Sequence, residues 1–270
     1  MVSLFMDWKQ NIPLAPYTTV KIGGPAEHLC EVDSYHQLKT ILCDLQKNGV
    51  STATILGNGS NTLISDTGIK GYVVINKSNE IELLDNNQIK ASSGVQLAKL
   101  IEFSHQNGLI GLESFAYIPS TLGAAISGNI HGTKFLFNDL VVSSEIIKLD
   151  KPIIISAILQ LKTGDVKTAK QEIQKIIKEK SNNQPMNSLG CIFKNPSPQL
   201  SAGLIIDKQL QLKGLCIGDA KISDKHANFI ENIGQASASD YYALIKLIQS
   251  KAKQELNINL DLEIKLLGQI

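Results

Sequence analysis

The sequence predicts an α+β protein made of two parts. Helix-type and strand-type patterns are mixed along the chain, without an internal repeat, up to a polar run at 181–185 that is typical of a break between domains. We therefore expect a first domain at 1–181 and a smaller second domain at 182–270. Close to the C-terminus apolar and polar residues alternate, as in a half-buried strand, and one face carries Ile258, Leu260, Leu262, Ile264 and Leu266.

The expected helices combine apolar residues at helical spacing with residues that begin or end a helix. Ser34 and Gln37 have the spacing of a capping box, and Asn48-Gly49 ends the helix that they begin. Asp165 caps a helix whose apolar face holds Val166, Ala169, Ile173, Ile176 and Ile177. The other expected helices are 96–106, 203–212 and 239–256, and the expected strands are 54–56, 72–75, 89–91 and 152–161.

The loop at 57–61 is the first candidate binding element. It consists of Gly57, Asn58, Gly59, Ser60 and Asn61, between two short apolar segments. Two glycines allow a tight turn, and successive backbone N–H groups in such a turn can bind an anion such as diphosphate. An ordinary polar hairpin would have the same composition, so the loop alone leaves both possibilities open. It is not a Rossmann fingerprint, because no third glycine follows at the required spacing and no helix opens there.

The stretch at 111–129 is the second candidate element. It is rich in small residues, and Pro119-Ser120 resembles the capped start of a helix that continues with Leu122 and Gly123. Small side chains allow a ligand to approach the backbone closely. Tight packing of this helix against a sheet is the alternative explanation.

Composition excludes several classes of protein. A net charge of +1 over 270 residues gives no field that would attract nucleic acid or an anionic membrane. The longest apolar run, 152–159, is too short to span a bilayer, and residues 1–12 lack the apolar core of a secretory signal. Four scattered cysteines without a C-x-x-C pair favour reduced thiols over disulfides or a metal site. We expect a soluble, cytoplasmic protein.

Six motifs stand in order along the chain. They are Tyr17-Thr-Thr-x-Lys-Ile-Gly-Gly-Pro-Ala26, Leu56-Gly-x-Gly-Ser-Asn-x-Leu-Ile64, Gly111-Leu-Glu with Ile118-Pro-x-Thr-x-Gly123, Gly190-Cys-Ile-Phe-Lys-Asn-Pro196, Lys225-His-Ala-Asn-Phe-Ile230, and Leu260-Asp-Leu-Glu-Ile264. Together they resemble the UDP-N-acetylenolpyruvoylglucosamine reductase (MurB) family nearly end to end. The resemblance implies a PCMH-type FAD-binding domain in the first part and a substrate-binding domain in the second.

The resemblance also implies a two-step reaction with FAD as cofactor and NADPH as reductant. NADPH reduces the flavin, which passes hydride to the enolpyruvyl double bond of UDP-N-acetylglucosamine enolpyruvate, and an acid protonates the neighbouring carbon. The product, UDP-N-acetylmuramate, enters peptidoglycan synthesis. By the family pattern the loop at 57–61 would hold the FAD diphosphate, and the rest of the flavin site would be lined by Thr19, Ile118, Ser120, Gly123 and Asn129.

Two residues take the catalytic positions that the resemblance implies. Cys191 stands where the family usually has a serine proton donor, and Glu263 corresponds to the catalytic carboxylate. A thiol, with an unperturbed pKa of about 8.5, is a better acid than a hydroxyl; a buried structural cysteine is the alternative. The candidates for substrate contact are Lys194, Asn195, His226 and Asn228, among which His226 is as readily explained as a structural histidine.

The main departure from the family lies at 130–152. The family has a longer segment there, with a Tyr-Arg-x-Ser motif whose arginine stabilises the enolate, whereas all 26 basic residues of this chain are lysines. Loss of such a stabiliser costs on the order of 10²–10³ in rate. Lys134 and Lys148 are candidate replacements.

Three interpretations follow from this departure. The first, which we prefer, is a working, minimal and monomeric reductase, and the second is a degenerate FAD-binding protein without the reductase step. The third is an FAD oxidase of the same superfamily. The MurB-like C-terminal half and the lack of a His or Cys flavin-attachment motif argue against an oxidase.

Overall fold

The computed structural model describes residues 7–270, which form two compact units. Of the described residues, the first unit comprises 7–9, 28–58 and 71–180, and the second comprises 10–27, 59–70 and 181–270. The chain passes from the first unit to the second for the last time between 180 and 181, one residue before the boundary that the sequence predicts. The sequence predicts that each domain is one continuous stretch, but the segments 10–27 and 59–70 belong to the second unit. Their residues Val20, Ile22 and Leu63 pack into its hydrophobic core.

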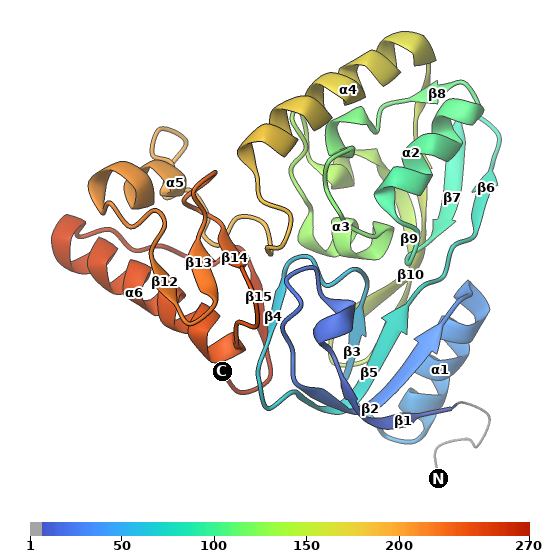
Figure 1. The fold of residues 1–270 in the computed structure, drawn as a ribbon. Coiled ribbons are helices and arrows are strands. Elements are labelled where there is room, and N and C mark those ends of the chain that lie inside the picture. Colours follow the sequence, from blue (N-terminus) through green and yellow to red (C-terminus); the bar gives the residue numbers. More distant parts are fainter. Residues whose placement is uncertain (1–6) are drawn as a thin grey trace. The chain divides into compact units, whose positions relative to one another are not determined.

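The first unit holds most of two sheets, although 10–13, 25–27 and 69–70 of the strands in one of them belong to the second unit. One has the order β1-β2-β5-β3 and the other β6-β7-β10-β9 (Figure 1). The strands of the first sheet are β1 (Lys9–Pro13), β2 (Pro25–Val32), β3 (Ala53–Leu56) and β5 (Ile69–Asn76). Those of the second are β6 (Ile81–Leu83), β7 (Gln88–Ser92), β9 (Val141–Lys148) and β10 (Pro152–Gln160).

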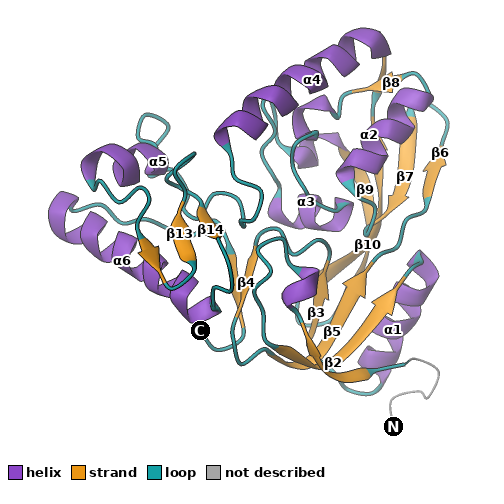
Figure 2. Ribbon diagram, in the orientation of Figure 1, coloured by secondary structure: helices purple, strands orange, loops and turns teal. Residues whose placement is uncertain are grey.

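Helices cover these sheets and close two hydrophobic cores. The apolar side of α1 (Tyr35–Lys47) packs with Val74 and Ile155 in one core. The other core joins α2 (Leu97–Gln106) and α3 (Leu122–Gly128) to β7 and β10, and Figure 2 shows these helices beside the strands. The remaining elements are β8 (Leu109–Ile110), β11 (Lys162–Thr163), α4 (Val166–Asn183) and the 3-10 turns Glu113–Phe115 and Phe137–Leu140.

The second unit packs one long helix against a small antiparallel sheet. Helix α6 (Ala238–Leu256) lies beside β12 (Cys216–Ile217) and β13 (Ala220–Ile222), and β14 (Ile230–Asn232) completes the sheet (Figure 1). A second, parallel pair joins β4 (Thr62–Ile64) to β15 (Lys265–Leu267). The unit also contains the 3-10 turn Ala15–Tyr17 and α5 (Ala202–Leu204), which continues as the π-helical turn Ile205–Gln209.

Most predicted elements are confirmed within a few residues, and their caps explain why. The Ser34 side chain accepts a hydrogen bond from the Gln37 backbone at the start of α1. Asn257, in the left-handed conformation, ends α6. None of the helices within residues 7–270 has the length and hydrophobicity needed to cross a membrane.

Three local predictions are wrong. Only Lys265–Leu267 of the expected C-terminal strand pairs in a sheet; the alternation before it reflects the burial of Leu260 and Ile264. The helix expected at 203–212 is broken into α5 and a π-helical turn. Ile177 is exposed, so α4 buries a narrower face than its pattern predicts.

Candidate functional site

The candidate residues fall in both units, and each group is built within its own unit. In the first unit, β3 ends at Leu56 and the chain enters the loop. A Cβ added to Gly57 would lie 2.5 Å from Thr121 Oγ1, so glycine lets the loop approach the start of α3. The Asn58 side-chain amide donates to the Pro119 carbonyl over 3.2 Å. The structure therefore brings together two candidate elements through residues that lie 61 positions apart in the chain.

The segment from Ile118 to Gly123 is held mainly through its backbone. Ser120 donates from its N–H to the Ile118 carbonyl over 2.8 Å and accepts from Leu97 N–H over 3.0 Å. Gly123 donates from its backbone to Ser93, and an added Cβ there would lie 2.8 Å from Ser93 Cβ. Close helix–sheet packing thus accounts for Gly123 by itself.

Asn129 ends α3 in the left-handed conformation, with φ at 40°. Its side-chain oxygen accepts a hydrogen bond from Asn138 N–H over 3.1 Å. The residue therefore joins α3 to the turn Phe137–Leu140, and its predicted contact with a cofactor stays a prediction.

Tyr117 is a residue of this stretch that sequence reasoning missed. Among the described residues, its hydroxyl is the one buried side-chain nitrogen or oxygen with no hydrogen-bond partner. A tyrosine within a segment already predicted to line a cofactor was the only available signal in the sequence.

In the second unit, the rest of the loop packs against the first motif. Gly59 has a φ of +57°, and an added Cβ would lie 2.4 Å from the Tyr17 carbonyl oxygen, so only glycine fits. Thr19 donates from its N–H to the Gly59 carbonyl over 3.4 Å and from its hydroxyl to Ser188 over 2.7 Å. Ser60 is half-buried and completes the turn.

The same loop connects to the segment that carries Glu263. The Asn61 side chain donates to the Glu263 carbonyl over 3.3 Å, and the Asn61 carbonyl accepts from Lys265 N–H over 2.9 Å. Asn61 therefore fixes the backbone on both sides of Ile264, which is buried.

Cys191 and Glu263 lie on two segments that pair with each other. Phe193 and Leu262 form an antiparallel bridge. Glu263 donates from its N–H to the Ile192 carbonyl over 2.8 Å, which places it beside the residue that follows Cys191. Two segments from distant parts of the chain, each with a residue that the sequence predicts to be catalytic, thus pair through their backbones.

The cysteines differ in their surroundings. None of the four forms a disulfide within the described part of the chain; Cys191 is half-buried, whereas Cys30 is buried in the core of the first unit. Burial, and then the charge of Glu31, raise the pKa of the Cys30 thiol to about 12, so Cys30 is unreactive. Within residues 7–270 no group of three His, Cys, Asp or Glu side chains could hold a metal ion.

Asn228 is a backbone clamp on the segment that carries Cys191. Its side-chain oxygen accepts from Phe193 N–H over 3.0 Å, and its side-chain nitrogen donates to the Phe193 carbonyl over 2.8 Å. Its own carbonyl accepts from Ile192 N–H over 2.8 Å. With 3% of its surface exposed, Asn228 is placed to support the site from behind rather than to meet a substrate.

Among the other predicted substrate contacts, Asn195 and His226 form hydrogen bonds within the protein, whereas the side chain of Lys194 is exposed. Asn195 accepts from Ala202 N–H over 3.0 Å and so begins α5. His226 accepts from Asn228 N–H through Nδ1 over 3.3 Å, and its ring packs edge-on against Phe229. Lys194 donates from its backbone to Asp261, and its side chain is exposed.

The shortened segment supplies no free cation at Lys134. Its Nζ lies 2.7 Å from Glu172 Oε1, and this hydrogen bond, followed by the charge of Glu172, raises the pKa of Lys134. Lys148, the other candidate, is exposed in β9. The chain between Asn129 and Pro152 is used for the turn Phe137–Leu140 and for β9.

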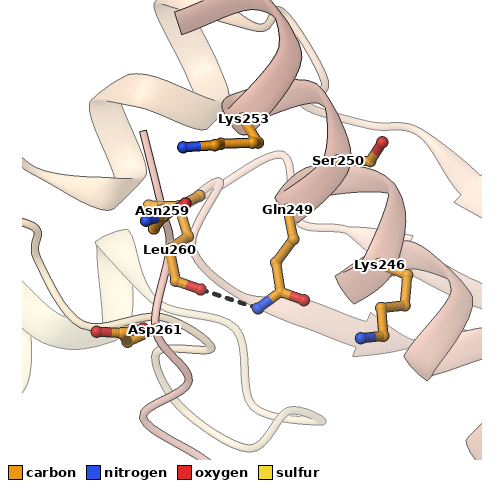
Figure 3. A pocket seen from close by; sticks show the side chains of 7 residues that line it. All are labelled: Lys246, Gln249, Ser250, Lys253, Asn259, Leu260 and Asp261. Atoms are coloured by element: carbon orange, nitrogen blue, oxygen red, sulfur yellow. Dashed lines mark hydrogen bonds between the residues drawn. The ribbon is translucent and has the colours of Figure 1, made fainter. Parts of the chain in front are cut away.

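A cavity of about 420 Å³ lies in the second unit beside α6. Figure 3 shows Gln249 pointing across it to the Leu260 carbonyl, to which it donates over 2.9 Å. The lining residues are Lys246, Gln249, Ser250, Lys253, Asn259, Leu260 and Asp261. None of the predicted site residues lines this cavity.

Comparisons with known proteins agree over most of the chain. The family model described as "FAD binding domain" matches residues 26–151, and that of the C-terminal domain of UDP-N-acetylenolpyruvoylglucosamine reductase matches 180–267. UDP-N-acetylenolpyruvoylglucosamine reductase of Synechococcus sp. (strain JA-3-3Ab) is 35% identical, with 96% of this chain and 90% of the relative aligned. The enzyme of Clostridium tetani is 32% identical over 97% of this chain and 92% of its own length.

A solved structure is also similar. The crystal structure of UDP-N-acetylenolpyruvylglucosamine reductase (MurB) from Thermus caldophilus has a TM-score of 0.81 and 28% identity, and the match covers 98% of this chain and 100% of that chain. The alignment with the Synechococcus relative extends over 285 residues, more than the 270 of this chain. That relative therefore has residues without a counterpart here.

Proposed function

This chain belongs to the UDP-N-acetylenolpyruvoylglucosamine reductase family, and we propose that it reduces UDP-N-acetylglucosamine enolpyruvate to UDP-N-acetylmuramate with FAD as cofactor and NADPH as reductant. The observation that carries the proposal is the pairing of the Cys191 and Glu263 segments through Phe193 and Leu262. Family membership supports the substrate class, since the relatives are named for this reaction.

The residues of the loop fit FAD. Within residues 7–270 no acceptor pairs with the backbone N–H groups of Asn58, Gly59, Ser60 and Asn61. Successive unpaired N–H groups in a glycine-containing turn are suited to an anion, and a diphosphate would satisfy them. Ile118, Ser120 and the unpaired hydroxyl of Tyr117 would contribute further contacts from the first unit.

The proposed chemistry assigns separate tasks to the cofactor and the chain. FAD held by the loop at 57–61 and the stretch at 118–123 would supply the hydride chemistry between NADPH and the enolpyruvyl double bond. Cys191 donates the proton to the neighbouring carbon from its Sγ. We assign Glu263, on the paired segment, as the catalytic carboxylate of the same step. Asn228 and Asn61 hold the two backbones in place.

A lysine has to meet the negative charge that develops on the substrate, because the chain has no arginine. We assign this task to Lys194, which is exposed and lies three residues from Cys191. Lys134 is less suited, because it would have to leave Glu172. An ammonium acts as a point charge and lacks the bidentate geometry of a guanidinium.

The proposal has a direct test in the steady state. Purified, FAD-loaded protein is mixed with NADPH, with and without UDP-N-acetylglucosamine enolpyruvate, and the absorbance of NADPH is followed. We expect consumption that depends on the substrate and is faster with NADPH than with NADH. Consumption that ignores the substrate would favour the second candidate, a degenerate FAD-binding protein, to which the shortened segment without arginine points.

We further propose that the enzyme is a monomer in the cytoplasm and takes part in peptidoglycan synthesis. The four cysteines form no disulfide within residues 7–270, which is consistent with a reducing compartment. Light scattering on the purified protein tests the monomer, and a mass equal to twice that of the chain would contradict it.

A further inference from the structure

The hydroxyl of Tyr117 is unusual for its lack of a partner. Buried tyrosine hydroxyls normally form a hydrogen bond, since an unpaired one has lost its hydration without replacement. Among the described residues Tyr117 Oη is the one buried side-chain nitrogen or oxygen in this condition.

Tyr241 is another tyrosine of this chain whose hydroxyl is buried. Tyr241 is fully buried in the second unit, and its hydroxyl donates to the Ile230 carbonyl over 2.9 Å. The hydroxyl of Tyr241 therefore has a hydrogen-bond partner within the protein, whereas that of Tyr117 has none among the described residues. This difference points to a ligand as the partner of Tyr117.

The backbone around Tyr117 is fixed. Ala116 donates from its N–H to the Glu113 carbonyl over 3.1 Å, and Ile118 donates to the Phe115 carbonyl over 3.0 Å. Pro119, two residues on, accepts from the Asn58 side chain. Tyr117 thus occupies a defined position between residues that we assign to the flavin site.

We infer that the Tyr117 hydroxyl forms a hydrogen bond with a polar group of bound FAD. This inference rests on the proposed function, because it takes FAD to be the ligand of the first unit. The carbonyls, ring nitrogens, ribityl hydroxyls and diphosphate oxygens of FAD are all suitable partners for a phenol, which both donates and accepts.

Tyr117→Phe tests the inference without an activity measurement. FAD is removed, and the affinity of each apoprotein for FAD is measured by quenching of flavin fluorescence, beside its thermal unfolding midpoint. Removing a hydrogen bond made only with the ligand is expected to weaken FAD binding about 5–10-fold. The midpoint of the apoprotein is expected to stay the same or rise, because an unpaired buried hydroxyl is removed.

Tyr241→Phe is the matched control, with the opposite expected pattern. Its apoprotein loses the bond to Ile230 and unfolds at a lower temperature, while its affinity for FAD stays that of the wild type. Wild-type affinity in Tyr117→Phe, or a lower midpoint of its apoprotein, would overturn the inference. If the wild-type apoprotein bound no FAD, the proposed function itself would fail, and the inference with it.

Discussion

The polar side chains around the Gly190–Pro196 motif and the hydroxyl of Tyr117 differ in whether the protein itself satisfies them. Around Cys191, the side chains of Asn195, His226 and Asn228 have acceptors occupied by neighbouring backbone N–H groups. In the stretch at 117–123, the buried hydroxyl of Tyr117 has no hydrogen-bond partner among the described residues.

This comparison separates two ways of building a site. A polar group that is satisfied within the protein holds its neighbours in a fixed geometry, which is what a proton donor needs. A buried polar group that is left unsatisfied is destabilising until a ligand pairs with it. We therefore assign positioning to the first group of residues and cofactor binding to the second.

Removal of the proton donor is expected to give the largest effect. Cys191→Ala should lower substrate-dependent turnover about 10²–10⁴-fold, the usual contribution of a general acid, while reduction of bound FAD by NADPH stays unchanged. Cys43→Ala, which changes another half-buried thiol, is the control and should have wild-type turnover. Stopped-flow absorbance of the flavin separates the two steps, and equal turnover in both variants would remove Cys191 from the mechanism.

Removal of the clamp should come next. Asn228→Leu leaves the N–H and carbonyl of Phe193 unpaired, and we expect a loss of about 2–4 kcal/mol in the free energy of unfolding. Reoxidation of the reduced enzyme by substrate should also slow, because the segment of Cys191 loses its support.

Asn232→Leu is the control for a general effect on the second unit. Asn232 is also buried, donates to the Val20 carbonyl and accepts from Gly234 and Ala236. It should lose similar stability in urea unfolding and retain the rate of reoxidation. The same rate loss in both variants would show that Asn228 acts only through stability.

Gly59→Ala should lower the free energy of unfolding by more than the strain of a left-handed alanine alone. Its Cβ would lie 2.4 Å from Tyr17 O, whereas Gly49, at φ +75°, has no atom within 4 Å of an added Cβ. Gly49→Ala should destabilise by about 1–2 kcal/mol, and Gly59→Ala by more, with weakened FAD binding. Equal unfolding free energies for the two variants would contradict the close approach of the loop to Tyr17.

Substitution of Asp66 should have the smallest effect, and it tests whether the segment 59–70 belongs to the second unit. The Asp66 carboxylate accepts from the backbone N–H groups of Ala238 and Ser239 and from the Ser239 hydroxyl, at the start of α6. Asp66→Asn should cost about 1 kcal/mol, as the loss of a helix cap does.

The pH dependence of this contribution has a defined sign. Partial burial raises the pKa of Asp66, but the hydrogen bonds from Ser239 and Ala238 outweigh it and lower the pKa overall. A lowered folded pKa means that the stability is present above the unfolded value of about 3.9 and is lost as the pH falls through the folded value. Unfolding curves of wild type and Asp66→Asn should therefore converge in acid; a constant difference would contradict the assignment.

The elements that the sequence predicts well are those with local causes. Ser34 and Gln37 define the start of α1 within four residues, and the apolar period of α6 is visible along its length. The parallel pairing of Leu63 with Leu266 depends on residues some 200 positions apart, so no local pattern reveals it. Because these contacts are not local, the sequence predicts the segments 10–27 and 59–70 in the first domain, whereas the structure has them in the second unit.

The candidate site follows the same division. The sequence motifs identify Cys191 and Glu263 as candidate catalytic residues. The bridge between Phe193 and Leu262, which pairs their segments, is a tertiary contact that no motif predicts. Asn228 could be predicted to matter, but not to bind the backbone of Phe193, which lies 35 residues away. The unpaired state of Tyr117 is a property of packing and has no counterpart in sequence.

The most direct test of the account is a single turnover with Glu263→Gln. Wild type and variant are loaded with FAD, reduced with one equivalent of NADPH without oxygen, and mixed with UDP-N-acetylglucosamine enolpyruvate in a stopped-flow instrument. Asp261→Asn, an exposed carboxylate two residues away, is the control. We predict wild-type reduction in all three proteins and reoxidation that is slower on the order of 10²–10³-fold only in Glu263→Gln. Reoxidation of Glu263→Gln at the wild-type rate would contradict the assignment of catalysis to the paired segments of Cys191 and Glu263.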